Sequence, residues 1–190
     1  MIDPKIIVAL DTYNLDEANL ILDQLDSNLC KIKIGSVAFN SLGQQFLQSV
    51  SERGFKIFLD LKLHDIPNTV QETILGFAGC SIDMLTVHLS GGEKMLEKAL
   101  LAAQRIDAKL IGVSLLTSLG ESDSTDLFNS NINNQIMRLF MIAKKINIDI
   151  VLTAHPTEVK RRTLIQKYAN VNDILDGFNN LRIFTKQNVN

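Results

Sequence analysis

The sequence predicts an α/β fold in which parallel strands curl into a (β/α) barrel of the TIM type. Short apolar runs rich in β-branched residues alternate with segments of helical periodicity, and this alternation is typical of βαβ units on a parallel sheet. Several runs end on a polar or small residue, among them Asp11, Lys62 and Ser90. Such endings suit a barrel that carries its functional groups at the carboxyl ends of its strands. The barrel is therefore favoured over an open, doubly wound sheet.

Each predicted strand is short and apolar, as buried parallel strands are. The six runs are KIIVALD (5–11), CKIKIG (30–35), KIFLDLK (56–62), MLTVHLS (84–90), KLIGVSLL (109–116) and DIVLTA (149–154). Helical spacing of apolar residues predicts helices between them, at 15–25, 37–53, 68–78, 92–105 and 133–145. After Pro156, residues 157–178 have the pattern of one long helix, and the end of the chain is polar.

The number of predicted strands is smaller than a closed barrel requires. Barrels of this type have eight strands and typically roughly 200 residues or more, whereas this chain has 190 residues. The sequence thus indicates an incomplete barrel of about six strands with a long C-terminal helix. A barrel that another chain completes is the alternative.

Composition limits the classes to which this chain can belong. With 46% hydrophobic residues and a formal net charge of −2, the chain can form one sizeable core, and we expect a soluble globular protein. Its Lys and Arg residues are spread along the chain, which argues against nucleic acid or an anionic membrane as a partner. No run approaches the roughly 20 apolar residues of a membrane span, and the start lacks a signal-peptide pattern. We therefore expect a cytoplasmic location, with Cys30 and Cys80 as reduced, buried thiols.

The run at 56–62 carries charges that point to chemistry. Asp60 and Lys62 are two residues apart, so a strand would place both side chains on one face, together with Phe58. Asp65 follows beyond the predicted strand end. A Lys between carboxylates stays protonated, because the negative charges stabilise its ammonium group, and it can then donate a proton to a developing carbanion. The alternative is a structural ion pair, since such networks also occur without a catalytic role.

Other polar side chains near strand ends have both functional and structural interpretations. Lys33 alternates with two isoleucines and would be costly inside a barrel unless paired, which favours a site role. Asp11 could instead cap the helix that begins near Leu15, and Thr117 could satisfy backbone groups of a loop. For His88, the favoured interpretation is a hydrogen-bonded histidine of the core or its rim.

The segment D-L-K-L-H-D-I-P-N-T at 60–69 matches the D-x-K-x-x-D-I-P-N-T signature of orotidine 5′-phosphate decarboxylases. Further segments similar to that family follow the same order and spacing: V-A-L-D ending at Asp11, K-I-K-I-G with Lys33, R-G-F-K-I-F at 53–58, V-H-x-S-G-G at 87–92 and L-T-S at 116–118. Residues 1–148 are therefore predicted to form a partial barrel that resembles this family.

The resemblance implies an enzyme that removes CO2 from the pyrimidine of orotidine 5′-phosphate to give UMP in de novo pyrimidine biosynthesis, without a metal or organic cofactor. Asp60, Lys62 and Asp65 would be the catalytic charges, with Lys62 as proton donor. Four further residues would bind the nucleotide: Asp11, Lys33, Thr69 and Thr117. In this family the aspartate that matches Asp65 enters the site of the neighbouring subunit, so the resemblance also implies a homodimer.

The segment 149–190 departs from the family pattern. The Gly-Ile-Arg and Gly-Arg segments with which the family grips the substrate phosphate are absent from the sequence, so strongly impaired activity is predicted. Instead, V-L-T-A-H-P-T-E at 151–158 resembles a motif of phosphoenolpyruvate carboxylase, in which the histidine matching His155 and arginines near Arg161 and Arg162 serve carboxyl transfer. A fused or rearranged reading frame is one interpretation, and a divergent sixth βα unit is the other. The alternative functions are an inactive remnant and, less favoured, a carboxylase fragment.

Overall fold

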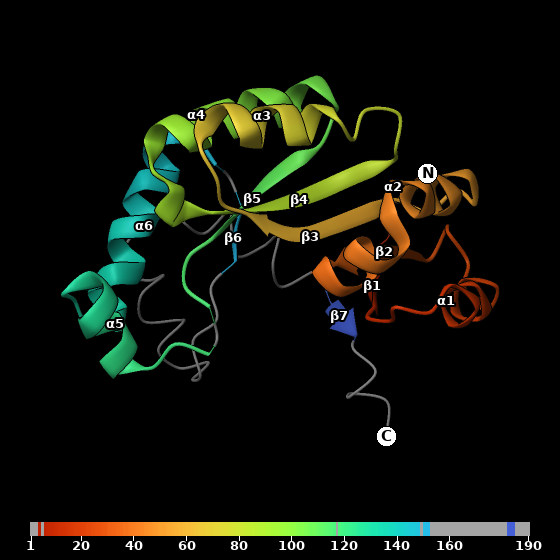
Figure 1. Ribbon diagram of the computed structural model, residues 1–190, viewed down its shortest axis with the longest axis horizontal. Coiled ribbons are helices and arrows are strands. Elements are labelled where there is room, and N and C mark those ends of the chain that lie inside the picture. Colours follow the sequence, from red (N-terminus) through yellow and green to blue (C-terminus); the bar gives the residue numbers. More distant parts are fainter. Residues whose placement is uncertain (1–3, 5, 117, 149, 153–181, 185–190) are drawn as a thin grey trace.

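A computed structural model describes residues 4, 6–116, 118–148, 150–152 and 182–184 of this chain (Figure 1). The first half contains β1 (Ile6–Leu10), α1 (Leu15–Leu22), β2 (Cys30–Gly35), α2 (Ser36–Glu52), β3 (Ile57–Leu63), α3 (Pro67–Leu75) and β4 (Ile82–His88). The second half contains the 3-10 turn η1 (Leu89–Gly91), α4 (Glu93–Arg105), β5 (Lys109–Val113), α5 (Glu121–Phe128), α6 (Ile132–Ile146), β6 (Ile150–Leu152) and β7 (Arg182–Phe184). The predicted alternation of strands and helices is confirmed.

All described strands belong to one parallel sheet with the order β6-β5-β4-β3-β2-β1-β7. Each of the six predicted strands overlaps an observed one, so the prediction of a partial TIM-type barrel is confirmed. The short turn η1, helix α5 and strand β7 were not predicted. β7 pairs with β1 from Ile6↔Arg182 to Val8↔Phe184, and α5 precedes α6. The long helix predicted at 157–178 lies outside the described residues.

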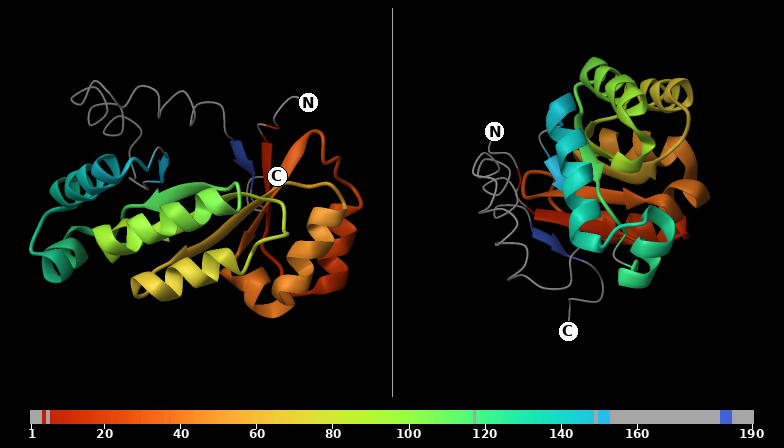
Figure 2. Two further views of the ribbon diagram at one scale, coloured as in Figure 1. Left: turned by 90° about the horizontal axis from the view of Figure 1, so that it is seen from above. Right: turned by 90° about the vertical axis from the view of Figure 1, so that its left-hand side faces the viewer.

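The curved sheet has a hydrophobic core on each face. The larger core joins the sheet to the helices and includes Ile32, Leu47, Leu59 and Leu96, each almost fully buried. The smaller one consists of strand residues alone, namely Ile7, Phe58, Met84 and Ile111, with Ile150 and Leu152 packed against them. Helices α3 and α4 lie side by side on one face of the sheet (Figure 2). The strand-only core therefore marks the inner face of the partial barrel.

The connection from β1 to α1 shows which residue caps the helix. The Asn14 side chain accepts hydrogen bonds from the backbone N–H groups of Asp16 and Glu17, at 2.9 and 3.0 Å, as an N-cap residue does. Asp11 therefore does not cap α1. Its carboxylate is left for other contacts at the end of β1.

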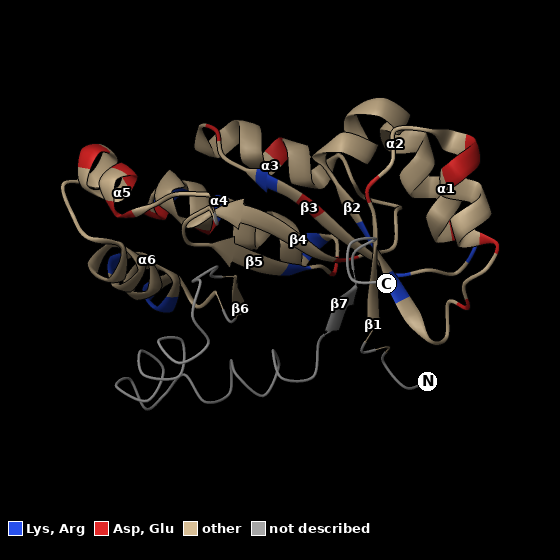
Figure 3. Cartoon of the chain, turned by 90° about the horizontal axis from the view of Figure 1, so that it is seen from below, with Lys and Arg blue, Asp and Glu red and all other residues tan. Residues whose placement is uncertain are grey.

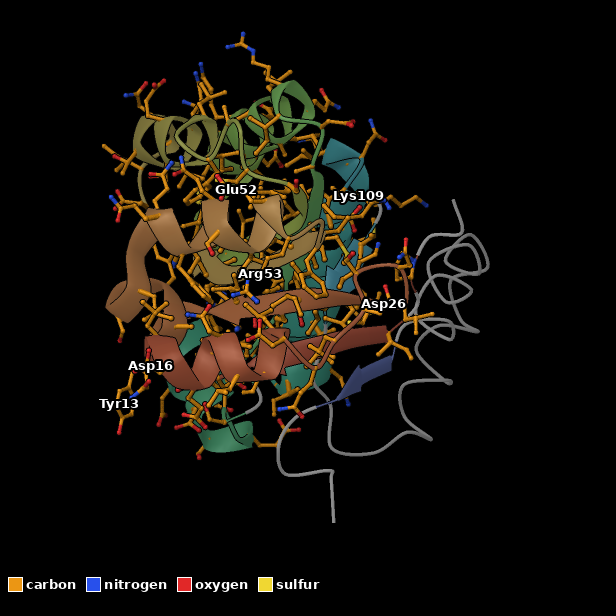
Figure 4. All side chains as sticks on the ribbon, turned by 90° about the vertical axis from the view of Figure 1, so that its right-hand side faces the viewer. Tyr13, Asp16, Asp26, Glu52, Arg53 and Lys109 are labelled. Atoms are coloured by element: carbon orange, nitrogen blue, oxygen red, sulfur yellow. The ribbon has the colours of Figure 1, made fainter. Side chains whose placement is uncertain are left out.

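A cluster of four charged side chains lies at the amino-terminal ends of the strands. The Lys31 ammonium donates to Asp83 Oδ2 at 2.7 Å, and these side chains are only 3% and 12% exposed. The ammonium groups of Lys56 and Lys109 each lie 4.0 Å from Asp83 Oδ1. Figure 4 shows Lys109 on the opposite side of the molecule from Tyr13, which follows β1. This amino-end cluster is thus remote from the carboxyl ends of the strands.

Cys30 is buried and Cys80 is half-buried, and neither forms a disulfide. Burial raises the pKa of both thiols, and the Asp26 carboxylate adds to the effect at Cys30. A cysteine is reactive when a lowered pKa makes it a thiolate. Because the pKa of both thiols is raised, both side chains act as packing groups. No helix in the described part of the chain combines the length and apolar character needed to cross a membrane.

Candidate active site

Strand β3 is irregular where it carries Lys62. Leu59 pairs with Leu85 of β4, and the next pair is Leu63 with Val87. Four residues of β3 therefore lie opposite two of β4, which is a β-bulge or similar irregularity. Lys62 lies within this bulge and has a φ of 51°, in the left-handed region that residues other than glycine seldom adopt. The regular alternation expected for this run therefore ends before Lys62.

Four of the predicted site residues form a chain of alternating charges at the carboxyl ends of β1, β2 and β3. The Lys62 ammonium donates to Asp60 Oδ1 at 2.9 Å, and the Lys33 ammonium lies 3.9 Å from Asp60 Oδ2 and 3.5 Å from Asp11 Oδ1. Figure 3 shows an acidic and a basic segment close together on β3. The order Asp11, Lys33, Asp60, Lys62 thus places each ammonium beside a carboxylate.

Burial decides how strongly these charges interact. The side chains of Lys33 and Asp60 are each 15% exposed, and that of Lys62 is 36% exposed. Charges in such positions are screened by water less than surface pairs are. Asp60 therefore lies near two ammonium groups in a partly buried site, in which Lys62 and Asp11 are the more exposed members.

Thr86 on β4 completes the immediate surroundings of Asp60. Its hydroxyl donates to Asp60 Oδ1 at 3.0 Å and accepts from the Lys62 backbone N–H at 2.8 Å. Sequence reasoning missed this residue. The available signal was a hydroxyl within the otherwise apolar run MLTV, two residues before His88.

Of the remaining predicted site residues, Asp65 and Thr69 form no hydrogen bond or ion pair with this array within the described part of the chain. The Asp65 carboxylate is exposed and accepts from the Ile66 backbone N–H at 2.6 Å. No ion pair links it to Lys62 within the described part of the chain. Thr69 is exposed in the first turn of α3. Thr117 lies outside the described residues.

His88 lies at the end of β4 beside the charged array, with its ring centroid 5.4 Å from that of His64. Burial lowers the pKa of His88 below its ordinary value of 6.5, and the positive charges of His64 and Lys62 lower it further, while Asp60 opposes them. The folded protein therefore favours the neutral imidazole. His88 therefore lies at the rim of the site in its neutral form, but within the described residues its ring makes none of the hydrogen bonds that the sequence led us to expect.

The lowered pKa of His88 predicts a dependence of stability on pH. An unfolded histidine titrates near 6.5, so as the pH falls through this value the unfolded chain binds a proton that the folded chain does not. The free energy of unfolding must then fall. The free energy of unfolding, measured by urea denaturation, should fall more between pH 7.5 and pH 5.5 in the wild-type chain than in His88→Gln. An equal fall in the two proteins would contradict a lowered pKa of His88 in the folded chain.

The described residues include no group of three or more His, Cys, Asp or Glu placed to hold a metal ion. The array instead offers ammonium groups, carboxylates and one hydroxyl. Such groups can bind a polar, anionic substrate and move a proton, because a protonated Lys is both a hydrogen-bond donor and an acid.

Comparison with known proteins places strands β1 to β6 in one family. The family model described as "Orotidine 5'-phosphate decarboxylase / HUMPS family" matches residues 4–170. A relative from Actinobacillus succinogenes, named orotidine 5′-phosphate decarboxylase, is 39% identical over 167 residues, which cover 85% of this chain and 72% of the relative. A protein of the same name from Legionella pneumophila is 38% identical over 184 residues, covering 94% of this chain and 80% of that protein.

Solved structures agree with the fold. The crystal structure of orotidine 5′-phosphate decarboxylase from Lactobacillus acidophilus is similar with a TM-score of 0.75 and 29% identity, over 89% of this chain and 77% of that one. An uncharacterised conserved protein from Geobacillus kaustophilus has a TM-score of 0.72 at 24% identity, over 93% of this chain and all of that one. The second likeness concerns the fold alone.

The matches give no support for a tail that resembles phosphoenolpyruvate carboxylase. The family match continues to residue 170, beyond the boundary predicted at residue 148, and the Legionella relative aligns with 94% of the chain. The boundary itself, between 1–148 and 149–190, stays a prediction. By its sequence, its fold and its named relatives, this chain belongs to the orotidine 5′-phosphate decarboxylase / HUMPS family.

Proposed function

We propose that this chain decarboxylates orotidine 5′-phosphate to UMP in pyrimidine biosynthesis, using the charged array at the carboxyl ends of β1, β2 and β3. The observation that carries the proposal is the alternation of Asp11, Lys33, Asp60 and Lys62, with neighbouring charges 2.9 to 3.9 Å apart. Membership of the family supports the reaction. The array supports it independently, because it combines an acid with carboxylates in one partly buried site.

The reaction needs a group that protonates a ring carbon after CO2 has left. When the bond between the ring and its carboxylate breaks, the electron pair stays on the ring carbon. The Lys62 ammonium, hydrogen-bonded to Asp60 at 2.9 Å, stabilises this negative charge and donates the proton to it. Asp60, beside the substrate carboxylate, raises the energy of the bound substrate. This repulsion ends when neutral CO2 departs, so the contribution favours the transition state.

Lys33 and Asp11 are suited to holding the sugar and carboxylate region of the substrate. Their ion pair of 3.5 Å joins the ends of β2 and β1, next to Asp60. The Gly-Ile-Arg and Gly-Arg segments that grip phosphate in the family are absent from the sequence. Since phosphate contacts provide binding energy that is used at the reacting centre, we expect strongly impaired turnover. An inactive remnant is the competing interpretation.

We further propose a homodimer in which Asp65 reaches the site of the partner subunit. The support is geometric: Asp65 is exposed beyond β3, and within the described chain no ion pair joins it to the Lys62 that it would serve. A second copy could bring its own Asp65 to this ammonium. The substrate orotidine 5′-phosphate and the product UMP are the proposed small-molecule partners, and a cytoplasmic location stays a prediction.

The dimer predicts complementation between two inactive variants. Lys62→Ala and Asp65→Ala are expected to be inactive alone, because each lacks one charge of every site. When they are co-expressed, half of the dimers are mixed, and each mixed dimer has one site with both charges. Activity should then return to about a quarter of the wild-type value, as two-fold symmetry dictates. No recovery, or an active Asp65→Ala protein, would contradict the shared site.

The decisive experiment for the proposed function is a decarboxylation assay on the purified chain, followed as loss of substrate absorbance. Activity that disappears in Lys62→Ala would support the proposal. No activity in a folded sample would favour the inactive remnant. Turnover close to that of the named relatives would contradict the predicted impairment and require another phosphate contact.

A further inference from the structure

Thr86 occupies an unusual place in the sheet. It is 0% exposed in the middle of β4, and its hydroxyl contacts two residues within the irregular segment of β3. It accepts from the Lys62 N–H at 2.8 Å and donates to Asp60 Oδ1 at 3.0 Å. One buried hydroxyl thus holds the backbone of one charged residue and the side chain of another.

The backbone of Lys62 needs such a contact. Its φ of 51° is disfavoured for a residue with a side chain, and such conformations persist only where their surroundings hold them. The register of β3 with β4 jumps from Leu59 to Leu63, and the register with β2 ends at Asp60. The Lys62 N–H therefore has no partner position in the sheet ladder, and the Thr86 hydroxyl replaces the carbonyl that a ladder would provide.

The same hydroxyl orients Asp60. The Thr86 hydroxyl and the Lys62 ammonium both donate hydrogen bonds to Asp60 Oδ1, at 3.0 and 2.9 Å. This arrangement leaves Oδ2 facing Lys33 at 3.9 Å. A hydroxyl can donate one hydrogen bond while it accepts another, so Thr86 makes both contacts at once. Valine, which has nearly the same shape, can make neither.

We propose that Thr86 is a positioning residue that sets the Lys62 ammonium and the Asp60 carboxylate in their working geometry through the left-handed bulge of β3. The inference rests on the proposed function, because it assigns Thr86 to the same array. Thr86 does not itself touch the reacting atoms. Its loss should impair the chemical step more than substrate binding, since a displaced catalytic group costs rate even when the substrate remains bound.

The test compares Thr86→Val with Thr86→Ser. Valine removes the hydroxyl and keeps the volume, while serine keeps the hydroxyl. We expect kcat to fall by about 10- to 100-fold in Thr86→Val with KM changed less than about threefold, and to stay within about threefold of the wild type in Thr86→Ser. A Thr86→Val protein with unchanged kcat, or a Thr86→Ser protein as impaired as Thr86→Val, would overturn the proposal.

A second measurement does not depend on activity. Amide hydrogen exchange of Lys62 should be at least roughly tenfold faster in Thr86→Val than in the wild type and Thr86→Ser, because the N–H loses its acceptor. The amide groups of Leu85 and Val87 report whether β4 itself stays folded. If Thr86→Val does not fold, Thr86→Cys replaces it, since a thiol is a weak donor and acceptor of similar size.

The two measurements separate the proposal from the proposed function. A wild-type chain without decarboxylase activity, but with faster Lys62 exchange in Thr86→Val, would refute the function and support the positioning contact. An active wild type in which Lys62 exchange is the same in all variants would refute the role of Thr86 while the function stands.

Discussion

Replacing Lys62 by alanine is expected to lower kcat for decarboxylation by about 10⁴-fold, because one side chain supplies both the proton and the main positive charge at the reacting carbon. Its ammonium is 2.9 Å from Asp60 Oδ1, so the substitution also leaves Asp60 with one counter-charge fewer. KM should change much less, since the substrate can still contact Lys33 and Asp11. The measurement is loss of substrate absorbance with purified protein.

A matched control tests whether any lysine would have this effect. Lys145 also donates to a carboxylate, Glu93, at 2.7 Å, but its side chain is 66% exposed on α6. Lys145→Ala should keep kcat within about twofold of the wild-type value, since exposed pairs contribute little. Equal activity in the wild type and Lys62→Ala would mean that the signal comes from a contaminating enzyme or that Lys62 is not the proton donor.

Much of the fold could be predicted because its strands are apolar runs of ordinary length. The prediction for β2 coincides with the observed strand Cys30–Gly35. Helix α5 was missed because its sequence, ESDSTDLF, has too few apolar residues for a periodic pattern. Its start depends instead on a local contact, in which the Gly120 N–H donates to Asp123 at 2.8 Å. β7 was missed because three residues are too short a run to stand out.

The candidate site was predictable to the extent that it is local in sequence. Asp60 and Lys62 stand close together and carry a specific signature, so spacing and resemblance both point to them. The bulge of β3 and the contact of Thr86 arise from the register between two strands, over a separation of 26 residues. No pattern within one run encodes such a register shift. The alternative for Asp11, a helix cap, failed because Asn14 lies closer to the start of α1 and caps it.

The amino-end cluster predicts a large effect on stability without one on chemistry. Asp83→Ala should lower the free energy of unfolding by about 3 to 5 kcal/mol, because it removes one partner of the buried Lys31–Asp83 ion pair. The pair is 2.7 Å long, with side chains 3% and 12% exposed. Lys56 and Lys109 lose the same carboxylate but are themselves about half exposed, so water can solvate them. Urea denaturation measures the change.

Two further variants distinguish burial from charge pairing in general. Asp23→Ala removes an equally direct partner, since Arg53 donates to Asp23 at 2.5 Å, but the Asp23 side chain is 63% exposed, and we expect a loss of less than about 1 kcal/mol. The double replacement of Lys31→Met with Asp83→Leu should recover most of the stability lost in Asp83→Ala, because two apolar groups remove the buried charge altogether. A double variant as unstable as Asp83→Ala would show that packing around Asp83, rather than the broken buried ion pair, sets the cost.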